Sequence, residues 1–147
     1  MKILEITQNK KTYLPLLLLA DEQESMIDKY LPRGTMYALD DDGVKAVCVV
    51  TDEGEGVLEI KNLAVLPSCQ RRGYGRRMVE FIRQKYSGVY KILQVGTGDS
   101  PLTVPFYEAC GFKRSHVVKN FFTQNYDHPI FEARVQLMDM VYFRLVI

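Results

Sequence analysis

The fold of this chain is decided by residues 57–86, which read VLEIKNLAVLPSCQRRGYGRRMVEFIRQKY. Residues 57–66 form a largely apolar run that predicts a β-strand, and Pro67 ends it. Residues 74–86 predict a helix, because their apolar side chains recur on one helical face: Met78, Val79, Ile82 and Tyr86. A short loop with two glycines joins the two elements. A further strand over residues 90–96 makes the whole stretch a βαβ unit.

The loop between this strand and helix has the chemistry of an anion site. The first amide N–H groups of a helix have no partner within the helix, and the helix dipole adds about half a positive charge there. Gly73 and Gly75 allow the backbone to turn and a phosphate to approach closely. Arg71, Arg72 and Arg76 add positive charge at the rim. A plain surface turn with solvated arginines is the alternative.

Two other nucleotide-binding motifs do not fit this loop. A dinucleotide fingerprint needs a third glycine, where this chain has Met78. It also needs an acidic residue about 20 positions further on, where the chain has Val95, Gly96 and Thr97. A P-loop needs a Gly-Lys-Ser/Thr sequence, which does not follow here. NAD and ATP are therefore disfavoured as ligands.

Outward from this unit, the chain continues to mix strands and helices. Further strands are predicted over residues 2–7, 35–39, 44–51, 112–119 and 137–146. Helices are predicted over residues 13–30 and 103–110. An Asp-Gly pair at 42–43, between apolar runs, signals a β-hairpin, and residues 120–136 are expected to form a loop. This order predicts an α/β fold in which a mixed sheet carries helices on both faces.

Length and composition favour one globular domain over residues 1–147. The formal net charge is +1, so we expect no nucleic-acid partner. We expect no signal peptide and no membrane association, since the apolar stretch 14–20 is too short to cross a bilayer. The three cysteines, Cys48, Cys69 and Cys110, lack metal-ligand spacing, so we expect no metal site. We expect them to be free thiols in a reducing cytoplasm.

The loop sequence Gln70-Arg71-Arg72-Gly73-Tyr74-Gly75 resembles the hallmark Q/R-x-x-G-x-G/A of the GCN5-related N-acetyltransferases, the GNAT superfamily. Downstream, residues 107–112 read YEACGF and are similar to the Y-x-x-x-G-F signature of that family. The lead-in LAVLP at residues 63–67 is also typical. The resemblance covers residues 2–119. It implies a GNAT-like fold, with a central, mostly antiparallel, splayed sheet, one parallel βαβ unit and helices on both faces.

The same resemblance implies acetyl-CoA as the co-substrate and an amine as the acceptor. The two strands of the βαβ unit are then expected to splay apart after Ala64, which leaves backbone groups of Leu63 and Val65 to pair with the pantetheine arm. The pyrophosphate is expected to bind the loop residues Gln70, Arg71, Arg72, Gly73, Tyr74, Gly75 and Arg76. Family members often place an Asn after the next strand, where Asp99 or Ser100 stands in here.

Two residues are candidates for the proton transfers of amide formation, because the amine must lose a proton and the thiolate must gain one. Glu59 is the candidate base. It lies within an apolar strand, where a charge is costly unless it is used or paired, and many family members carry a catalytic glutamate at this distance before the loop. A structural pair with Lys61, or an exposed strand face, is the alternative. Tyr107 is the candidate acid, since in the family this hydroxyl faces the CoA sulfur; a core aromatic is the alternative.

A covalent route through a cysteine is not favoured. Neither Cys69 nor Cys110 has a histidine nearby in the sequence to act as its base, and the dipole at a helix C-terminus disfavours a thiolate at Cys110. Both side chains are expected to be buried. Direct transfer is the expected route.

The sequence does not specify the acceptor beyond a small-molecule amine or a peptide. Specificity is expected from the N-terminal helices and from residues 120–136, whose aromatic side chains suit a pocket, a cover over the sheet or a homodimer interface. Residues 121–126 resemble a subgroup of small bacterial members, some of them labelled auxin acetyltransferases. An acyl-CoA-binding module without activity and a purely structural α/β domain are the alternative functions.

Overall fold

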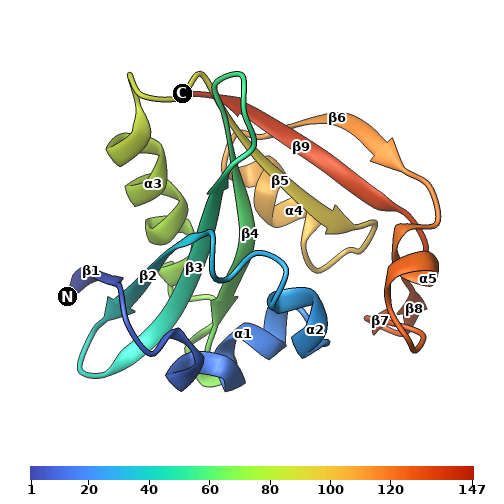
Figure 1. Ribbon diagram of the computed structural model, residues 1–147, viewed down its shortest axis with the longest axis horizontal. Coiled ribbons are helices and arrows are strands. Elements are labelled where there is room, and N and C mark those ends of the chain that lie inside the picture. The colour runs from blue at the N-terminus through green and yellow to red at the C-terminus, as the bar shows by residue number, and fades with distance from the viewer.

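A mixed seven-stranded sheet forms the centre of the protein, and the computed structural model describes residues 1–147 (Figure 1). In sheet order its strands are β1 (Lys2–Ile6), β2 (Thr35–Asp40), β3 (Val44–Asp52), β4 (Val57–Val65), β5 (Ile92–Gly98), β9 (Met140–Val146) and β6 (Lys113–Val118). Only β4 and β5 run parallel, and every other pair of neighbours is antiparallel. The predicted fold class, with its single parallel βαβ unit, is confirmed.

One face of the sheet is covered by α3 (Tyr74–Tyr86) and α4 (Val104–Ala109). The apolar stripe of α3 packs onto the sheet, with Met78, Val79 and Ile82 buried among strand side chains. Full burial of each such side chain contributes about 1.5–3 kcal/mol. The stripe read from the sequence therefore fixes which side of α3 faces the core.

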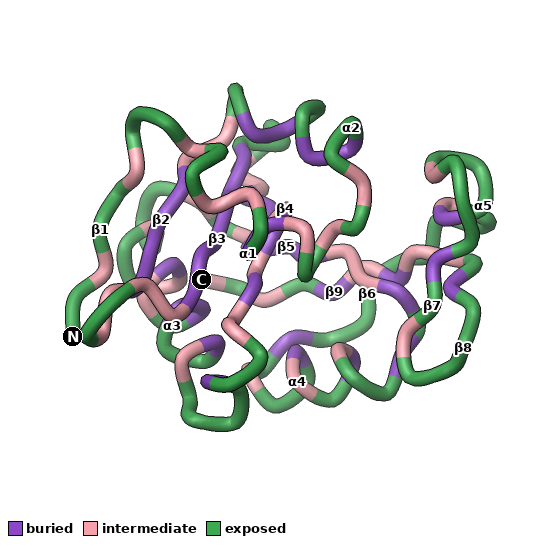
Figure 2. The backbone as a smooth tube through the Cα atoms, turned by 90° about the horizontal axis from the view of Figure 1, so that it is seen from below, coloured by how far each residue is buried: buried purple, intermediate pink, exposed green.

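The opposite face is covered by α1 (Leu14–Ala20) and α2 (Glu24–Ile27), which bury Leu17 and Ile27 in a second apolar cluster. Two short 3₁₀ helices, η1 (Lys10–Tyr13) and η2 (Pro67–Cys69), precede α1 and the loop before α3. Figure 2 shows buried residues running along β2 and β3 in the middle of the molecule, between the two helical layers. None of the helices has the length and apolar character needed to span a membrane.

The parallel strands β4 and β5 separate part-way along their length. Their pairing runs from Val57–Ile92 to Ile60–Val95, after which β4 continues to Val65 without a partner on that side. The splay was expected after Ala64, and that position is wrong. The reason is a β-bulge in the β3–β4 pairing next to Lys61, because a bulge bends its strand and increases the local twist.

Residues 120–136 are not the simple loop that was expected. They contain α5 (Phe121–Asn125) and a hairpin of β7 (Phe131–Glu132) and β8 (Val135–Gln136). The hairpin turn has no glycine: Ala133 and Arg134 take positive φ angles of 49° and 66°. The sequence lacked the usual glycine or asparagine signal for such a turn, so this element was missed.

Candidate active site

The loop before α3 presents a row of free backbone donors. The amide N–H groups of residues 71–76 donate to no carbonyl or side chain, whereas the next amide, that of Arg77, bonds to the Gly73 carbonyl at 3.0 Å. Gly73 has a φ of 85° and Arg71 a φ of 64°. Successive residues of this kind turn their N–H groups toward one concave side and form an anion-binding nest. The loop is thus a donor-rich cradle at the positive end of a helix dipole.

The side chains around this cradle hold it in place and leave its positive charges without ion-pair partners. Tyr74 donates its hydroxyl to Asp41 Oδ2 at 2.6 Å, and Arg76 donates to the Ala109 carbonyl at 3.3 Å. Arg71 and Arg72 are exposed and form no ion pair. All the predicted loop residues therefore lie together at the start of α3, with two unpaired cations at the rim.

Gly75 has a packing role that the sequence did not reveal. A Cβ at this position would lie 3.1 Å from Phe106 Cζ and 3.3 Å from Cε1, so the glycine lets α3 approach α4 closely. A Cβ at Gly73, in contrast, would meet nothing within 4 Å. Helix packing thus depends on Gly75, whereas Gly73 faces open space.

The gap between β4 and β5 exposes a strand edge. Leu66 donates its amide to the Lys45 carbonyl on β3 at 2.9 Å. Because backbone groups alternate sides along a strand, those of Leu63 and Val65 face away from β3, into the gap. Gln70 Nε2 reaches the Val65 carbonyl at 3.4 Å, which shows that this carbonyl is accessible from the loop. An extended chain in the gap could pair with β4 as an added strand.

Tyr107 lies on α4 with its ring buried among aromatic side chains. Its ring centroid lies 5.0 Å from that of Phe106 and 5.6 Å from that of Phe112. Its hydroxyl forms no hydrogen bond with another protein group, although the ring is only 7% exposed. Burial raises the pKa of this hydroxyl, and the nearby Cys48, Cys110 and Glu132 raise it further. The phenol therefore stays protonated and has a proton to donate.

Glu59 on β4 is buried and both of its oxygens are engaged. Oε1 accepts a hydrogen bond from Gln94 Nε2 at 2.6 Å, and Oε2 forms an ion pair with Lys61 Nζ at 2.8 Å. Gln94 in turn accepts from Arg144 Nε on β9 at 2.8 Å. The ion pair with Lys61, which was the alternative to a catalytic role for Glu59, is therefore present. Glu59 lies one position before the last residue of β4 that pairs with β5.

Asp99 and Ser100 follow β5, as the sequence suggested, and have separate surroundings. Ser100 is buried and its Oγ accepts from the Leu102 amide at 3.1 Å, which organises the turn before α4. Its hydroxyl proton remains free to donate. Asp99 is exposed and lies 3.5 Å from Arg114.

The cysteine thiols are free, as expected. Burial raises the pKa of Cys48 and of Cys110, so neither is a ready thiolate nucleophile. Cys69 is buried as well, whereas Cys110 is only partly buried, which corrects the expectation for it. No cluster of three or more His, Cys, Asp or Glu side chains has an arrangement that could hold a metal ion.

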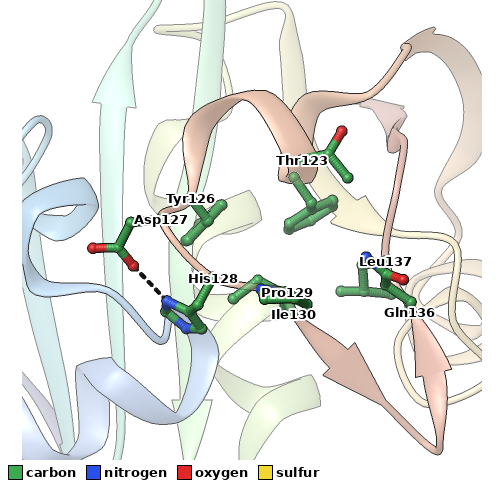
Figure 3. Close-up of a pocket in the computed structure, with 9 residues that line it drawn as sticks. Thr123, Tyr126, Asp127, His128, Pro129, Ile130, Gln136 and Leu137 are labelled. Atoms are coloured by element: carbon green, nitrogen blue, oxygen red, sulfur yellow. Dashed lines mark hydrogen bonds and ion pairs between the residues drawn. The ribbon is translucent and has the colours of Figure 1, made fainter.

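The segment between β6 and β9 contains an open cavity of about 220 Å³ (Figure 3). Its lining residues are Phe122, Thr123, Tyr126, Asp127, His128, Pro129, Ile130, Gln136 and Leu137. His128 Nδ1 lies 2.6 Å from Asp127 Oδ1 at the rim. None of the predicted cofactor-binding residues lines this cavity.

Hydrogen bonds tie this segment to the N-terminal helices. Asp21, after α1, accepts from the Tyr126 hydroxyl at 2.6 Å and from the Tyr30 hydroxyl at 3.0 Å. Asn62 Nδ2 on β4 donates to the Tyr30 oxygen and to the Leu17 carbonyl. Because that carbonyl can only accept, the amide orientation is fixed, and Asn62 Oδ1 is left buried without a partner. Asn62 was missed, since only the fold brings it to this position.

Comparison with known proteins decides the family. Residues 32–114 match the model of the acetyltransferase (GNAT) domain. The chain belongs to the GNAT acetyltransferase family. It is 36% identical over 129 residues, 86% of its length, to the uncharacterized N-acetyltransferase YvbK of Bacillus subtilis, of which the match covers 83%.

Solved GNAT structures have the same fold over nearly the whole chain. An acetyltransferase of this family from Elizabethkingia anophelis, with acetyl-CoA bound, superposes with a TM-score of 0.94 and 31% identity, covering 99% of this chain and 97% of that one. A Bacillus cereus protein described as an IAA acetyltransferase superposes with a TM-score of 0.91 and 29% identity, covering 99% of each chain. The family, the fold and acetyl-CoA as the co-substrate are confirmed.

Proposed function

We propose that this GNAT protein is an N-acetyltransferase that passes the acetyl group of acetyl-CoA directly to an amine on a small molecule or a peptide. One observation carries the proposal. The backbone amides of residues 71–76 are free at the positive end of α3. The unpaired edge of β4 at Leu63 and Val65 and the unbonded hydroxyl of Tyr107 support the same proposal. Residues 1–147 act as one domain, and the free cysteines suit the reducing cytoplasm.

Binding of the co-substrate uses the loop before α3 and the open edge of β4. The amides of residues 71–76 hold the pyrophosphate, and Gln70, Arg71, Arg72 and Arg76 frame it. Leu63 and Val65 pair with the pantetheine arm through their backbone groups. At the far end of the gap, the hydroxyl of Ser100 has a free proton to donate, and Asp99 lies at the surface.

Acetyl-CoA supplies the acetyl group as an activated thioester. The acceptor nitrogen forms the new C–N bond, the C–S bond breaks, and Tyr107 gives its proton to the leaving thiolate. The raised pKa of Tyr107 keeps that proton available until the thiolate forms. The neutral amine loses one proton when it attacks, and that proton passes through a bridging water to Glu59, whose carboxylate also holds Gln94 and Lys61.

A module that binds acyl-CoA without catalysing transfer is the second candidate. The observation that favours it is the ion pair of Glu59 with Lys61, which gives this buried carboxylate a structural role. Turnover separates the two candidates, since only the enzyme releases CoA when an amine is present.

The proposed site is tested by calorimetry of acetyl-CoA binding, with NAD and ATP as controls. Arg72→Glu is expected to weaken acetyl-CoA binding, because it reverses an unpaired charge at the cradle. Arg77→Glu is the matched control, as Arg77 is exposed but its amide is already engaged in the helix. Equal binding of all three nucleotides, or equal losses in both variants, would contradict the assignment of the loop.

A further inference from the structure

Residues 120–137 form a small unit between β6 and β9, at one end of the sheet (Figure 1). Its buried apolar side chains pack as a cluster separate from the two clusters on the faces of the sheet: Phe122, Ile130 and Leu137. The two ends of the unit lie side by side, because Asp139 Oδ1 accepts from the Asn120 amide at 2.8 Å. The unit thus has its own core and a narrow base.

Asp21, in the turn between α1 and α2, joins this unit to the N-terminal helices. Its Oδ1 accepts from the Tyr126 hydroxyl at 2.6 Å, and its Oδ2 accepts from the Tyr30 hydroxyl at 3.0 Å. Burial and the charge of Asp21 raise the pKa of both tyrosines, so each hydroxyl keeps its proton and donates it to the carboxylate. The carboxylate therefore uses one oxygen for each side of the junction.

Only one further hydrogen bond crosses this junction, from the Asp127 amide to Gln23 Oε1 at 3.0 Å. No ion pair joins residues 120–137 to residues 1–112. Apolar packing does not replace these bonds, because the cluster of the unit and the cluster under α1 and α2 have no member in common. The junction is therefore held by two polar side chains, those of Asp21 and Gln23.

The unit bridges the two strands that separate. On β5, the side chain of Leu137 occupies the space that a Cβ on Gly98 would need, at 2.6 Å. On β4, Asn62 Nδ2 donates to the Tyr30 oxygen at 3.1 Å, and Tyr30 is bonded in turn to Asp21. Both strand positions, 62 and 98, lie beyond the last paired residues of β4 and β5. The unit is therefore joined to both sides of the split.

These two connections lie on the same face of the sheet. Asn62 Nδ2 also donates to the Leu17 carbonyl of α1 at 3.0 Å, so its side chain lies on the α1 face. Leu93 and Val95 of β5 pack in the cluster under α3. Because side chains alternate along a strand, Gly98 faces the opposite way, toward the α1 face. The unit therefore closes over the split from the side of α1.

We infer that residues 120–137 form a lid over this face of the split, and that the Asp21 carboxylate is the latch that holds the lid closed. The lid keeps its own core and moves about its base, while the sheet stays folded. Release of the latch breaks a few hydrogen bonds and exposes no main cluster, so it requires far less free energy than unfolding. Tyr126 and Asp127 also line the cavity of Figure 3, which loses this wall when the lid opens.

Hydrogen exchange of single amides, measured by NMR on the full chain, tests the latch. The Asp127 amide bonds only across the junction, so its exchange rate reports how often the lid opens. Tyr126→Phe removes the latch hydroxyl and keeps the ring, and we expect it to raise that rate about ten- to hundredfold. Asp21→Asn is expected to raise it less, because the amide oxygen still accepts one hydroxyl. Tyr90→Phe is the matched control and is expected to match wild type, since the Tyr90 hydroxyl also bonds to an aspartate, Asp52, but away from the lid.

Three results would overturn the inference. Equal exchange of the Asp127 amide in wild type and Tyr126→Phe would mean that Asp21 is no latch. Equal acceleration of the Leu137 amide, which bonds to the Ile130 carbonyl inside the unit, would mean that the unit unfolds rather than moves. An effect of the same size in the control variant would mean a general loosening of the fold. These rates are measured without turnover, so they are independent of any failure of the proposed acetyl transfer.

Discussion

Glu59 and Lys61 form an ion pair, with 2.8 Å between Oε2 and Nζ. The two residues flank Ile60, the last residue of β4 that pairs with β5. Lys61 also lies 4.0 Å from Glu53, which is paired with Arg33 at 2.9 Å. Charges thus alternate in sign from Arg33 through Glu53 and Lys61 to Glu59. The ion pair with Lys61 and the hydrogen bond from Gln94 hold the Glu59 side chain in place.

Glu59→Gln is expected to lower kcat by roughly 10²–10⁴-fold, because the amine loses its route for proton release. Affinity for acetyl-CoA should stay constant, since Glu59 lies away from the loop before α3. Loss of the partner of Lys61 should also lower the free energy of unfolding by about 1–3 kcal/mol. Steady-state kinetics and urea unfolding measure the two effects. A variant that loses stability but keeps kcat would show that the pair is purely structural.

Gly75→Ala is expected to destabilise the protein by about 1–3 kcal/mol, because the new methyl group would press on Phe106. It should also weaken acetyl-CoA binding by displacing the start of α3. The same substitution in a Phe106→Leu background should lower the free energy of unfolding by less, since the smaller side chain leaves room for the methyl group. Thermal unfolding of the four proteins in this cycle measures the coupling, and equal costs in both backgrounds would exclude the contact as the cause.

The surroundings of Glu53 predict how the stability of the folded protein changes in acid. Burial tends to raise the pKa of this carboxyl, but the hydrogen bonds from Thr51 and Arg33 and the charge of Lys61 outweigh burial and lower the pKa below its ordinary value of 4.5. A lowered carboxyl pKa stabilises the folded state above that value, and the stabilisation is lost as the pH falls through the folded-state pKa.

Glu53→Gln should therefore be less stable than wild type near neutral pH, by about 1 kcal/mol or less, because Arg33 is half exposed. The difference should vanish once the wild-type carboxyl is protonated. Unfolding free energies across a pH series measure this, and a difference that persists in acid would contradict the assignment.

The strand–loop–helix core of the fold could be predicted because its signals are local. The apolar stripe of residues 74–86 and the glycines of the loop before it are readable without knowing any distant contact. The position of the splay could not be predicted, because it depends on how β4 pairs with β3, where the bulge next to Lys61 ends the contact with β5 early.

The acceptor side depends on long-range contacts, so the sequence revealed little of it. The engagement of Glu59 requires the strand registers that bring Gln94 and Arg144 beside it. The hairpin of β7 and β8 requires a turn formed by Ala133 and Arg134, residue types that rarely adopt a positive φ. The sequence therefore predicted the loop before α3 far better than the surroundings of Glu59 or the β7–β8 hairpin.

The central claim, catalysis of acetyl transfer through Tyr107, is tested most directly by the rate of CoA release from acetyl-CoA in the presence of an amine. The comparison is between wild type and Tyr107→Phe, with acetyl-CoA affinity measured on the same samples. We predict that the variant loses roughly 10²-fold or more in kcat and keeps its acetyl-CoA affinity, because only the proton donor is removed from a ring that keeps its packing. Equal rates of CoA release in the two proteins would contradict the claim.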